Sequence, residues 1–375
     1  MPQAILEKLI TYPTITPNEC GIYSYIQSLL PDSFQAIPIH RNAVSNLFLF
    51  KDYNPSSTQP KLHLCFGGHI DVVPAGEGWS SPPFEPHIKD GYLYGRGTQD
   101  MKGGIACFLS AIQEFQARSN LIISILLTSD EEGDGVDGTK VVLEYLERHH
   151  LLPDLAIIAE PTSTDKLGDM IKIGRRGSIH SKITLQGVQG HSAYPQKCQN
   201  PIEMLGARLG KIAGHDLDNG DEHFEPSKIV ITDLRAGMQM SNVTPDTLSM
   251  MLNVRNSTLT NANDVDNYLR ETLQGLPFTL ETKTSSLPFL TPHDCFLVQT
   301  LSASIERTMG FTPTLGTTGG TSDARYFAPY GIEVVELGVI NDRIHAKDER
   351  VSLQELQDLK AIFKDFLYTL SKENQ

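Results

Sequence analysis

Outside its middle section, the chain carries four short apolar runs that predict buried strands. They cover residues 62–66, 121–128, 155–159 and 333–339. Continuous apolar strands of this length are typical of a mainly parallel sheet that helices cover on both faces. A helix is expected to start at Gly103 or Gly104, because apolar residues recur at helical spacing from Ile105 to Phe115. A further helix is expected at residues 296–309.

The middle of the chain follows a different pattern. Ile179, Ile183 and Leu185 share one face of an alternating strand. The periodicity then predicts a helix at 201–213, strands at 229–234 and 247–254, a helix at 262–273 and a strand at 278–284. This β-α-β-β-α-β order is that of ferredoxin-like domains. The expected fold is therefore α/β: a mixed, mainly parallel sheet flanked by helices (residues 1–177 plus 287–375), with an inserted α+β domain (178–286).

Composition narrows the function classes. A chain of 375 residues usually forms more than one compact core, which agrees with two domains. The formal net charge of −14, from 31 basic and 45 acidic residues, argues against nucleic acid and anionic membranes as partners. No apolar run approaches the length of a membrane span, and residues 1–10 lack the apolar segment of a signal peptide. The five widely spaced cysteines include no CxxC pair, which favours a reducing compartment.

Five short segments carry candidate metal ligands, and four of these segments follow predicted strands. The candidates are His69, Asp100, Glu160, His345 and one of the neighbours Glu131 and Glu132. In α/β sheets, ligands bind beyond the carboxyl ends of the strands, so we expect these side chains to meet at one edge. Two imidazoles with several carboxylates and no thiolate suit zinc, or a harder ion such as manganese or cobalt. One carboxylate more than a single site needs suggests two metals that share a bridge.

Each of these residues also has a plainer interpretation. His69 with Asp71 could be a strand-end histidine capped by a turn aspartate, although Asp71 could also hold the far nitrogen of His69 and fix its tautomer. Glu131 and Glu132 could form an exposed acidic turn, but adjacent residues leaving a strand point in different directions. One could ligate a metal while the other faces the reacting water. The shared sheet edge makes the joint pattern far stronger than its parts.

Several segments resemble a known family over nearly the whole chain. They are Gly68-His69-Ile70-Asp71, Tyr94-Gly95-Arg96-Gly97, Asp100-Met101-Lys102-Gly103, Ser129-Asp130-Glu131-Glu132, Gly174-Arg175-Arg176-Gly177-Ser178, Gly190-His191-Ser192-Ala193-Tyr194 and Gly319-Gly320-Thr321-Ser322-Asp323. The family is that of the metallopeptidase-type deacylases with two co-catalytic zinc ions. The last three segments are most similar to its branch that hydrolyses N-succinyl-L,L-2,6-diaminopimelate in lysine and diaminopimelate biosynthesis.

The resemblance implies a role for each candidate residue. Asp100 would bridge two zinc ions, His69 and Glu160 would complete one site, and Glu132 and His345 the other. Glu131 would be the general base and Asp71 the partner of His69. The inserted domain would form a homodimer, and its His191 would reach the partner's active site to stabilise the oxyanion. The resemblance also implies a cytoplasmic enzyme and a cis peptide bond between Asp100 and Met101.

Substrate contacts are expected from a further set of residues. Arg175, Arg176 and Arg255 can form paired hydrogen bonds with the carboxylates of a polycarboxylate substrate. By position alone, Arg175 and Arg176 could instead be a solvated hinge. The resemblance adds Ser178, Tyr194, Asn242, Gly320 and Thr321. The segment from Met238 to Ser241 is bulkier than expected for the branch.

Two alternatives remain open at this point. An acetylornithine deacetylase, or a related dipeptidase or aminoacylase, would keep the metals and change the carboxylate contacts. A non-catalytic binding protein on the same scaffold would be expected to have lost the base or the bridging ligand, and both Glu131 and Asp100 are present.

Overall fold

The computed structural model describes residues 1–116 and 119–374. Its internal contacts divide the chain into two compact units. Unit 1 consists of Met1–Ile173, Thr291–Gly316 and Ser322–Gln375, and unit 2 consists of Gly174–Leu290 with Thr317–Thr321. Unit 2 therefore begins before, and ends after, the insertion expected at residues 178–286, and it includes a short segment from later in the chain.

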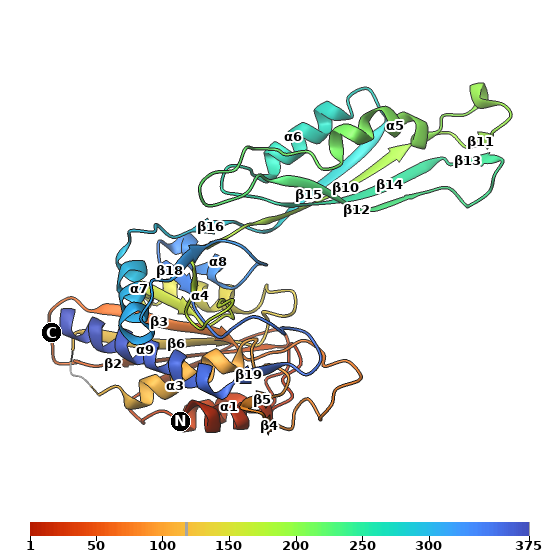
Figure 1. The fold of residues 1–375 in the computed structure, drawn as a ribbon. Helices are drawn as coiled ribbons and strands as arrows, with labels where there is room; N and C mark the ends of the chain where they lie inside the picture. Colours follow the sequence, from red (N-terminus) through yellow and green to blue (C-terminus); the bar gives the residue numbers. More distant parts are fainter. Residues whose placement is uncertain (117–118, 375) are drawn as a thin grey trace. The chain divides into compact units, whose positions relative to one another are not determined.

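Unit 1 is built on an eight-stranded sheet in the order β1-β2-β6-β3-β7-β18-β8-β17 (Figure 1). The strands are β1 (Gln35–Arg41), β2 (Val44–Asp52), β3 (Leu62–His69), β6 (Leu121–Thr128), β7 (Leu155–Ile158), β8 (Met170–Lys172), β17 (Thr314–Gly316) and β18 (Glu333–Glu336). The pairs β6–β3, β3–β7, β7–β18 and β8–β17 are parallel, and β1–β2, β2–β6 and β8–β18 are antiparallel. The predicted fold class, a mixed and mainly parallel sheet flanked by helices, is confirmed.

The four central parallel strands are the apolar runs of the sequence. β6 has the predicted bounds, whereas β3 continues to His69 and β18 already ends at Glu336. Nearly every residue of β3, β6 and β7 is buried. Burial on both faces explains why these strands read as continuous apolar runs rather than as alternating ones.

Helices cover this sheet. They are α1 (Pro2–Ile10), α2 (Ile22–Ser28), α3 (Lys102–Glu114), α4 (Thr139–Arg148), α7 (Phe296–Met309), α8 (Ala324–Phe327) and α9 (Leu353–Glu373). α3 packs against both α1 and α9, and α4 packs against β6 and α8. The prediction of α7 is confirmed residue for residue, and that of α3 is confirmed with a start at Lys102.

A small antiparallel sheet of unit 1 was not predicted. It contains β4 (His87–Lys89), β5 (Tyr92–Tyr94) and β19 (Arg350–Ser352), in the order β19-β5-β4. Three-residue strands are too short to produce a recognisable hydrophobic period. β5 is followed by the turn that carries Asp100, and β19 follows the loop that carries His345.

Unit 2 has the predicted β-α-β-β-α-β order. Its elements are β10 (Ser178–Gln186), α5 (Pro201–Ile212), β12 (Lys228–Ala236), β14 (Thr247–Arg255), α6 (Ala262–Thr272) and β15 (Phe278–Ser286), with the short pairs β9 (Gly174–Arg175) and β16 (Phe289–Leu290), and β11 (Gly190–His191) and β13 (Val243–Thr244). The four long strands form an antiparallel sheet in the order β12-β14-β10-β15, which is the ferredoxin-like arrangement.

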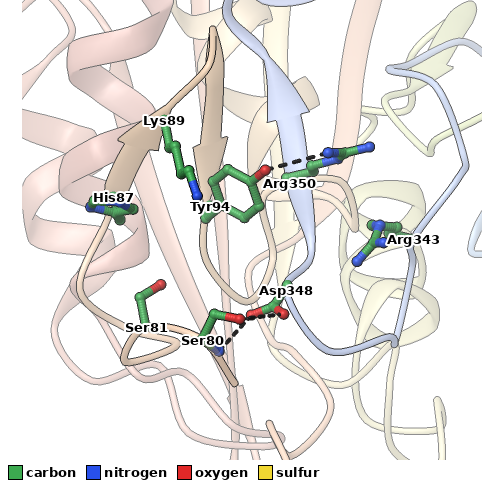
Figure 2. A pocket seen from close by; sticks show the side chains of 8 residues that line it. All are labelled: Ser80, Ser81, His87, Lys89, Tyr94, Arg343, Asp348 and Arg350. Atoms are coloured by element: carbon green, nitrogen blue, oxygen red, sulfur yellow. Dashed lines mark hydrogen bonds between the residues drawn. The ribbon is translucent and has the colours of Figure 1, made fainter. Parts of the chain in front are cut away.

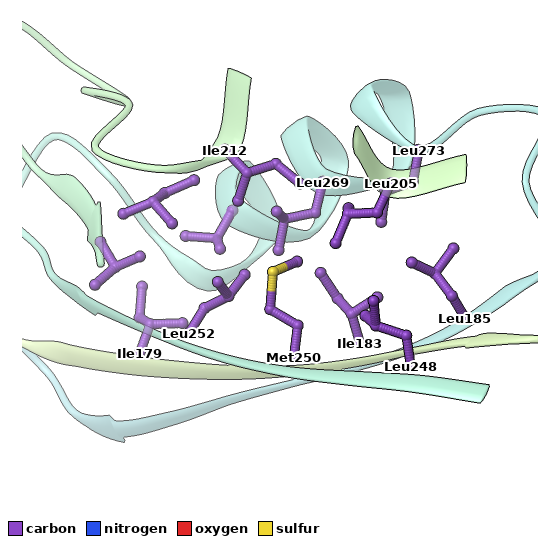
Figure 3. Packing of buried hydrophobic residues seen from close by; sticks show 13 residues of the cluster. Ile179, Ile183, Leu185, Leu205, Ile212, Leu248, Met250, Leu252, Leu269 and Leu273 are labelled. Carbon is purple, nitrogen blue, oxygen red and sulfur yellow. The ribbon is translucent and has the colours of Figure 1, made fainter. Parts of the chain in front are cut away.

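A hydrophobic core of its own holds unit 2 together. Ile183 of β10 and Met250 of β14 lie beneath Leu205 of α5 and Leu269 of α6, and all four are buried (Figure 3). Alternate residues of β14 are buried, as expected for a sheet with one covered face. In the described part of the chain, no helix of either unit combines the length and the apolar character that a membrane crossing needs.

Candidate metal centre

Three neighbouring strands of unit 1 end at the same edge of the sheet and deliver acid and imidazole groups to it. His69 is the last residue of β3. Glu131 and Glu132 follow β6, and Glu160 follows β7, and these strands flank β3 on either side. The carboxyl ends of parallel strands are the expected position for a binding site in such a sheet.

One group of possible ligands is buried and centres on His69. Its Nε2 lies 3.1 Å from Oδ1 of Asp100 and 3.7 Å from Oε1 of Glu160. The side chain of His69 is 1% exposed, and those of Asp100 and Glu160 are each 10% exposed. Ligand atoms of all three residues lie within 4.8 Å of one another, close enough to share one ion.

A second group uses the other oxygen of the same aspartate. Nε2 of His345 lies 3.2 Å from Oδ2 of Asp100 and 3.0 Å from Oε1 of Glu132. Asp100 thus presents one carboxylate oxygen to each group. Glu131 belongs to a third set of close ligand atoms, with His69 and Glu132. The structure therefore brings together all five sequence-predicted ligands and places Glu131 beside them.

The position of Asp100 depends on a residue that the sequence reasoning missed. The buried carboxylate of Glu349 accepts hydrogen bonds from the backbone N–H groups of Gly97, Gln99 and Asp100, at 3.0, 2.8 and 3.2 Å. It also pairs with Arg96, whose Nη1 lies 2.7 Å from Oε2. A buried carboxylate surrounded by donors in this way holds the turn before α3 in one conformation.

Arg96 extends the same contacts to the second histidine. Its Nη2 donates to the backbone oxygen of His345 at 3.3 Å, and its Nη1 donates to that of Ala346 at 3.2 Å. The Arg96–Glu349 pair therefore connects the turn of Asp100 to the loop of His345. The only signal in the sequence was Arg96 within a glycine-rich stretch, together with an acid a few residues after His345.

Asp71 supports the centre differently from the prediction. Nδ1 of His69 lies 2.9 Å from the main-chain oxygen of Asp71 and 3.7 Å from its carboxylate. The predicted carboxylate contact is thus replaced by a backbone contact, which still fixes the orientation of the ring. The carboxylate of Asp71 instead accepts the backbone N–H of Glu132 at 3.1 Å and that of Glu131 at 3.4 Å, so it shapes the turn after β6.

Crowded carboxylates shift the pKa values of the centre. Burial raises the pKa of Glu131 to about 8, and burial together with the charge of Asp100 raises the pKa of Glu160 well above its usual value. Hydrogen bonds that His345 donates to the carboxylates of Asp100 and Glu132 raise its pKa to about 10. Burial opposes ionisation of Asp100, but hydrogen bonds from His345 and His69 hold its pKa below the usual range.

These features fit divalent metal ions. Asp100, Glu131, Glu132 and Glu160 place more negative charge at the sheet edge than the two histidines can offset, and the edge is largely buried. Bound cations would remove this imbalance and lower the raised carboxylate pKa values. Imidazole and carboxylate donors are those preferred by zinc, manganese and cobalt. The peptide bond between Asp100 and Met101 is cis, as the sequence resemblance implied.

The predicted substrate contacts lie in unit 2 and fall into two groups. Arg175 is buried, and its Nη1 donates to the backbone oxygen of Thr318 at 2.9 Å. Gly320 and Thr321 follow directly in this short segment of unit 2. A Cβ at Gly319 would collide with Nη1 of Arg175, and its φ of 112° also favours glycine, which explains the first glycine of the pair in the sequence motif.

Most of the remaining predicted contacts are more exposed to solvent. Arg176 lies 3.7 Å from a carboxylate oxygen of Glu225. Ser178 is buried and accepts a hydrogen bond from Asn253 at 3.1 Å. The exposed ones lie on β11, β14 and the segments beside them: His191, Tyr194, Asn242 and Arg255. The rings of His191 and Tyr194 meet edge to face, with centroids 5.8 Å apart.

Comparison with known proteins adds independent evidence. A succinyl-diaminopimelate desuccinylase from Helicobacter pylori is 54% identical over 98% of this chain and 98% of its own. The structure of an aminopeptidase PepT from Bacillus cereus has a TM-score of 0.80 at 21% identity and covers 98% of both chains. The YXEP protein of Bacillus subtilis, described as a dinuclear metal-binding peptidase, has a TM-score of 0.74 at 13% identity and covers 99% of this chain and 98% of its own. The model of peptidase family M20/M25/M40 matches residues 65–369, and the chain belongs to this family.

Proposed function

We propose that this protein hydrolyses N-succinyl-L,L-2,6-diaminopimelate to succinate and L,L-2,6-diaminopimelate, a step of lysine and diaminopimelate biosynthesis. The observation that carries the proposal is Asp100, which offers one oxygen to each of two ligand groups with Glu131 alongside. The name of the Helicobacter pylori relative, at 54% identity, supports the choice of substrate within the family. The alternative of a non-catalytic protein has no support, because Glu131 and Asp100, the proposed base and bridging residue, are both present.

Two divalent ions are proposed as cofactors, with zinc as the first choice and cobalt or manganese as substitutes. Asp100 would bridge them, with His69 and Glu160 on one ion and Glu132 and His345 on the other. The ions would supply the positive charge that polarises the scissile carbonyl and acidifies the attacking water. Asp71 and the Arg96–Glu349 pair would act as positioning residues, since they contact the ligands and not the reacting atoms.

Glu131 is proposed as the general base. Its carboxylate lies beside the five proposed ligands and is not one of them, so it can accept a proton from the attacking water. Glu131 accepts a proton from the attacking water as the new C–O bond forms, and passes it to the amine nitrogen as the C–N bond breaks. Succinate and the free amine leave, and Glu131 returns to its starting charge.

Recognition of the substrate is proposed to rest on unit 2. Arg175, Arg176 and Arg255 would bind the carboxylates of the substrate, because a guanidinium forms paired, charge-assisted hydrogen bonds with a carboxylate. The hydroxyl, amide and backbone groups that would orient the rest of the molecule are those of Ser178, Tyr194, Asn242, Gly320 and Thr321. An acetylornithine deacetylase would need fewer cations for its smaller substrate.

Homodimer formation through unit 2 is a further part of the proposal. β12 is an edge strand of its sheet. Val230 and Leu234 on β12, and Met251 on β14, are 51%, 45% and 45% exposed. An edge strand with exposed apolar side chains is a ready surface for pairing with a second copy. In such a dimer, His191 would donate a hydrogen bond to the developing oxyanion in the partner's active site. The reducing environment suggested by the free cysteines agrees with a cytoplasmic enzyme.

The decisive experiment compares two substrates on the zinc-loaded protein. Hydrolysis of N-succinyl-L,L-2,6-diaminopimelate and of N-acetylornithine would be measured in parallel as kcat/KM. We expect a preference of at least about 100-fold for the succinyl substrate, because N-acetylornithine lacks the succinyl carboxylate and each charge-assisted hydrogen bond contributes about 1.5–3 kcal/mol. A preference for N-acetylornithine would agree with the proposed metal chemistry but refute the proposed substrate. Hydrolysis of neither compound by protein with two bound metals would refute the proposal.

A further inference from the structure

A second concave site lies on unit 1, separate from the candidate metal ligands. It is a pocket of about 410 Å³ between the small sheet β19-β5-β4 and the loops that precede β4 and β19 (Figure 2). The pocket is lined by Ser80, Ser81, His87, Lys89, Tyr94, Arg343, Asp348 and Arg350. None of these residues belongs to the groups of possible metal ligands in the described part of the chain.

The register of the small sheet explains this lining. His87 pairs with Tyr94, and Tyr94 pairs with Arg350, so the three side chains stand in one row on the same face. Leu93 and Val351 point to the opposite face and are 0% and 1% exposed. The sheet therefore buries its apolar face against unit 1 and presents polar and cationic side chains to the pocket.

Positive charge dominates the pocket, although the protein as a whole carries a formal charge of −14. Lys89, Arg343 and Arg350 contribute three cations, and Asp348 is the one acid of the lining. The carboxylate of Asp348 already accepts hydrogen bonds from the backbone N–H of Ser80 at 2.8 Å and from its hydroxyl at 3.0 Å. Three cations around one pocket favour an anionic ligand.

The guanidinium of Arg350 is held in place, and not all of its N–H donors have hydrogen-bond partners among the described residues. Its guanidinium lies 4.3 Å from the ring centroid of Tyr92 and donates to the hydroxyl of Tyr94 at 3.3 Å. Nη2 lies 3.6 Å from a carboxylate oxygen of Asp342, a separation too long for a hydrogen bond. Nε is buried and has no hydrogen-bond partner among the described residues. Stacking on the ring of Tyr92 fixes the orientation of the guanidinium donors before a ligand binds.

We propose that this pocket binds a small dianion bearing phosphate-type or carboxylate groups, held by Lys89, Arg343 and Arg350. The volume exceeds that of one inorganic anion and suits a small organic dianion with its ordered water. Guanidinium and ammonium groups with nearby hydroxyls from Ser81 and Tyr94 are the donors that such anions use. The site does not depend on the proposed hydrolysis, because it shares no residue with the metal centre.

The bound anion has a structural consequence. Arg343 and Asp348 lie in the loop that also carries His345, whereas Lys89 lies on β4. An anion held by Lys89 and Arg343 together would tie this loop to the small sheet. The site is therefore an effector site that orders the loop of a proposed metal ligand.

Calorimetry with sulfate, phosphate and succinate on the full-length protein tests the site. We expect saturable binding of at least one of these probes by the unmodified protein, and Lys89→Gln should weaken it about tenfold through loss of one charge-assisted contact. Sulfate and phosphate binding without succinate binding would identify phosphate-type ligands, and the reverse would identify carboxylates. Lys140→Gln, at an exposed lysine outside the pocket, should leave the affinity unchanged.

Hydrogen exchange gives the second measurement. Amides of residues 342–348 should exchange more slowly when the binding probe is added to the unmodified protein, and this protection should be lost in Lys89→Gln. Lys89 is an exposed residue of a short strand, so the variant is expected to fold. Equal affinities of the unmodified protein and Lys89→Gln, or no binding of any of the three anions, would overturn the proposal.

Discussion

Unit 1 carries two sites of opposite charge that share one loop. The candidate metal centre gathers carboxylates around His69 and His345, and three of its five proposed ligands, His69, Glu132 and Glu160, lie at the ends of main-sheet strands. The cationic pocket gathers Lys89, Arg343 and Arg350 on the face of the small sheet. The loop between β18 and β19 supplies His345 to the first site and Arg343 to the second.

The difference between the sites shows how neighbouring groups decide the chemistry of a loop. In the metal centre, carboxylates raise the pKa of His345 to about 10 and make cations the expected ligands. In the pocket, the carboxylate of Asp348 already accepts two hydrogen bonds from Ser80, so the guanidinium groups make anions the expected ligands. Substitutions or pH changes should therefore affect the two sites differently.

The largest expected effect concerns the base of the metal centre. Glu131→Gln keeps the shape of the side chain and removes its ability to accept a proton, so kcat should fall roughly 10²–10⁴-fold. Metal content, measured by elemental analysis, should stay at two ions per chain, because Glu131 is not one of the five proposed ligands. Asp134→Asn, at an exposed acid of the same turn, serves as the matched control and should retain full activity. Retained activity in Glu131→Gln would refute its role as the base.

The next effect concerns the support of the bridging ligand. Glu349→Gln leaves Arg96 without its buried counter-ion and should lower the free energy of unfolding by about 3 kcal/mol. The Arg307–Asp365 pair is partly exposed, so Asp365→Asn should cost less than about 1 kcal/mol. Urea unfolding of the metal-free proteins compares the two variants. Equal losses would show that the Glu349 network does not stabilise the turn of Asp100.

The sequence predicted the metal centre far better than it predicted the pocket. His69, Glu131 and Glu160 follow long apolar strands whose ends must meet at one sheet edge, so their proximity follows from hydrophobic pattern and topology alone. The pocket depends on three-residue strands and on the pairing of Tyr94 with Arg350, far apart in the chain. Strands that short carry no readable period, and one sequence gives no information about such long-range pairing.

The same distinction explains the contacts that the prediction missed. Glu349 could not be recognised as the anchor of Asp100, because backbone N–H groups are its partners and leave no trace in side-chain identity. For the same reason, the main-chain oxygen of Asp71 replaced its carboxylate as the partner of His69. Residue types that suit a metal can be read from a sequence, whereas backbone contacts require the fold.

The pH dependence of the two sites should differ. Metal binding requires neutral His345, whose pKa in the metal-free protein is raised to about 10 by the hydrogen bonds that it donates to Asp100 and Glu132. Each metal bound there displaces a proton, so affinity should rise about tenfold per pH unit from about pH 6.5 to 9. Competition of Co²⁺ between the protein and a chelator measures this slope. The affinity of the pocket for sulfate should change much less, because guanidinium groups stay protonated. A flat profile for Co²⁺ would contradict the proposed ligand role of His345.

The smallest effect tests whether the net charge of the pocket governs its ligand. Asp348→Asn removes the one acid of the lining but keeps an oxygen that can accept the hydrogen bonds of Ser80. Because the acid is only half-buried and solvent screens it, the affinity for sulfate should rise only about two- to fivefold. The same kind of change in the metal centre, Asp100→Asn, should instead weaken binding of both ions, because the amide cannot replace a bridging carboxylate. Calorimetry with sulfate on the first variant and metal analysis on the second would provide the comparison. Weaker sulfate binding by Asp348→Asn would mean that Asp348 shapes the pocket through Ser80 rather than opposing its ligand by charge.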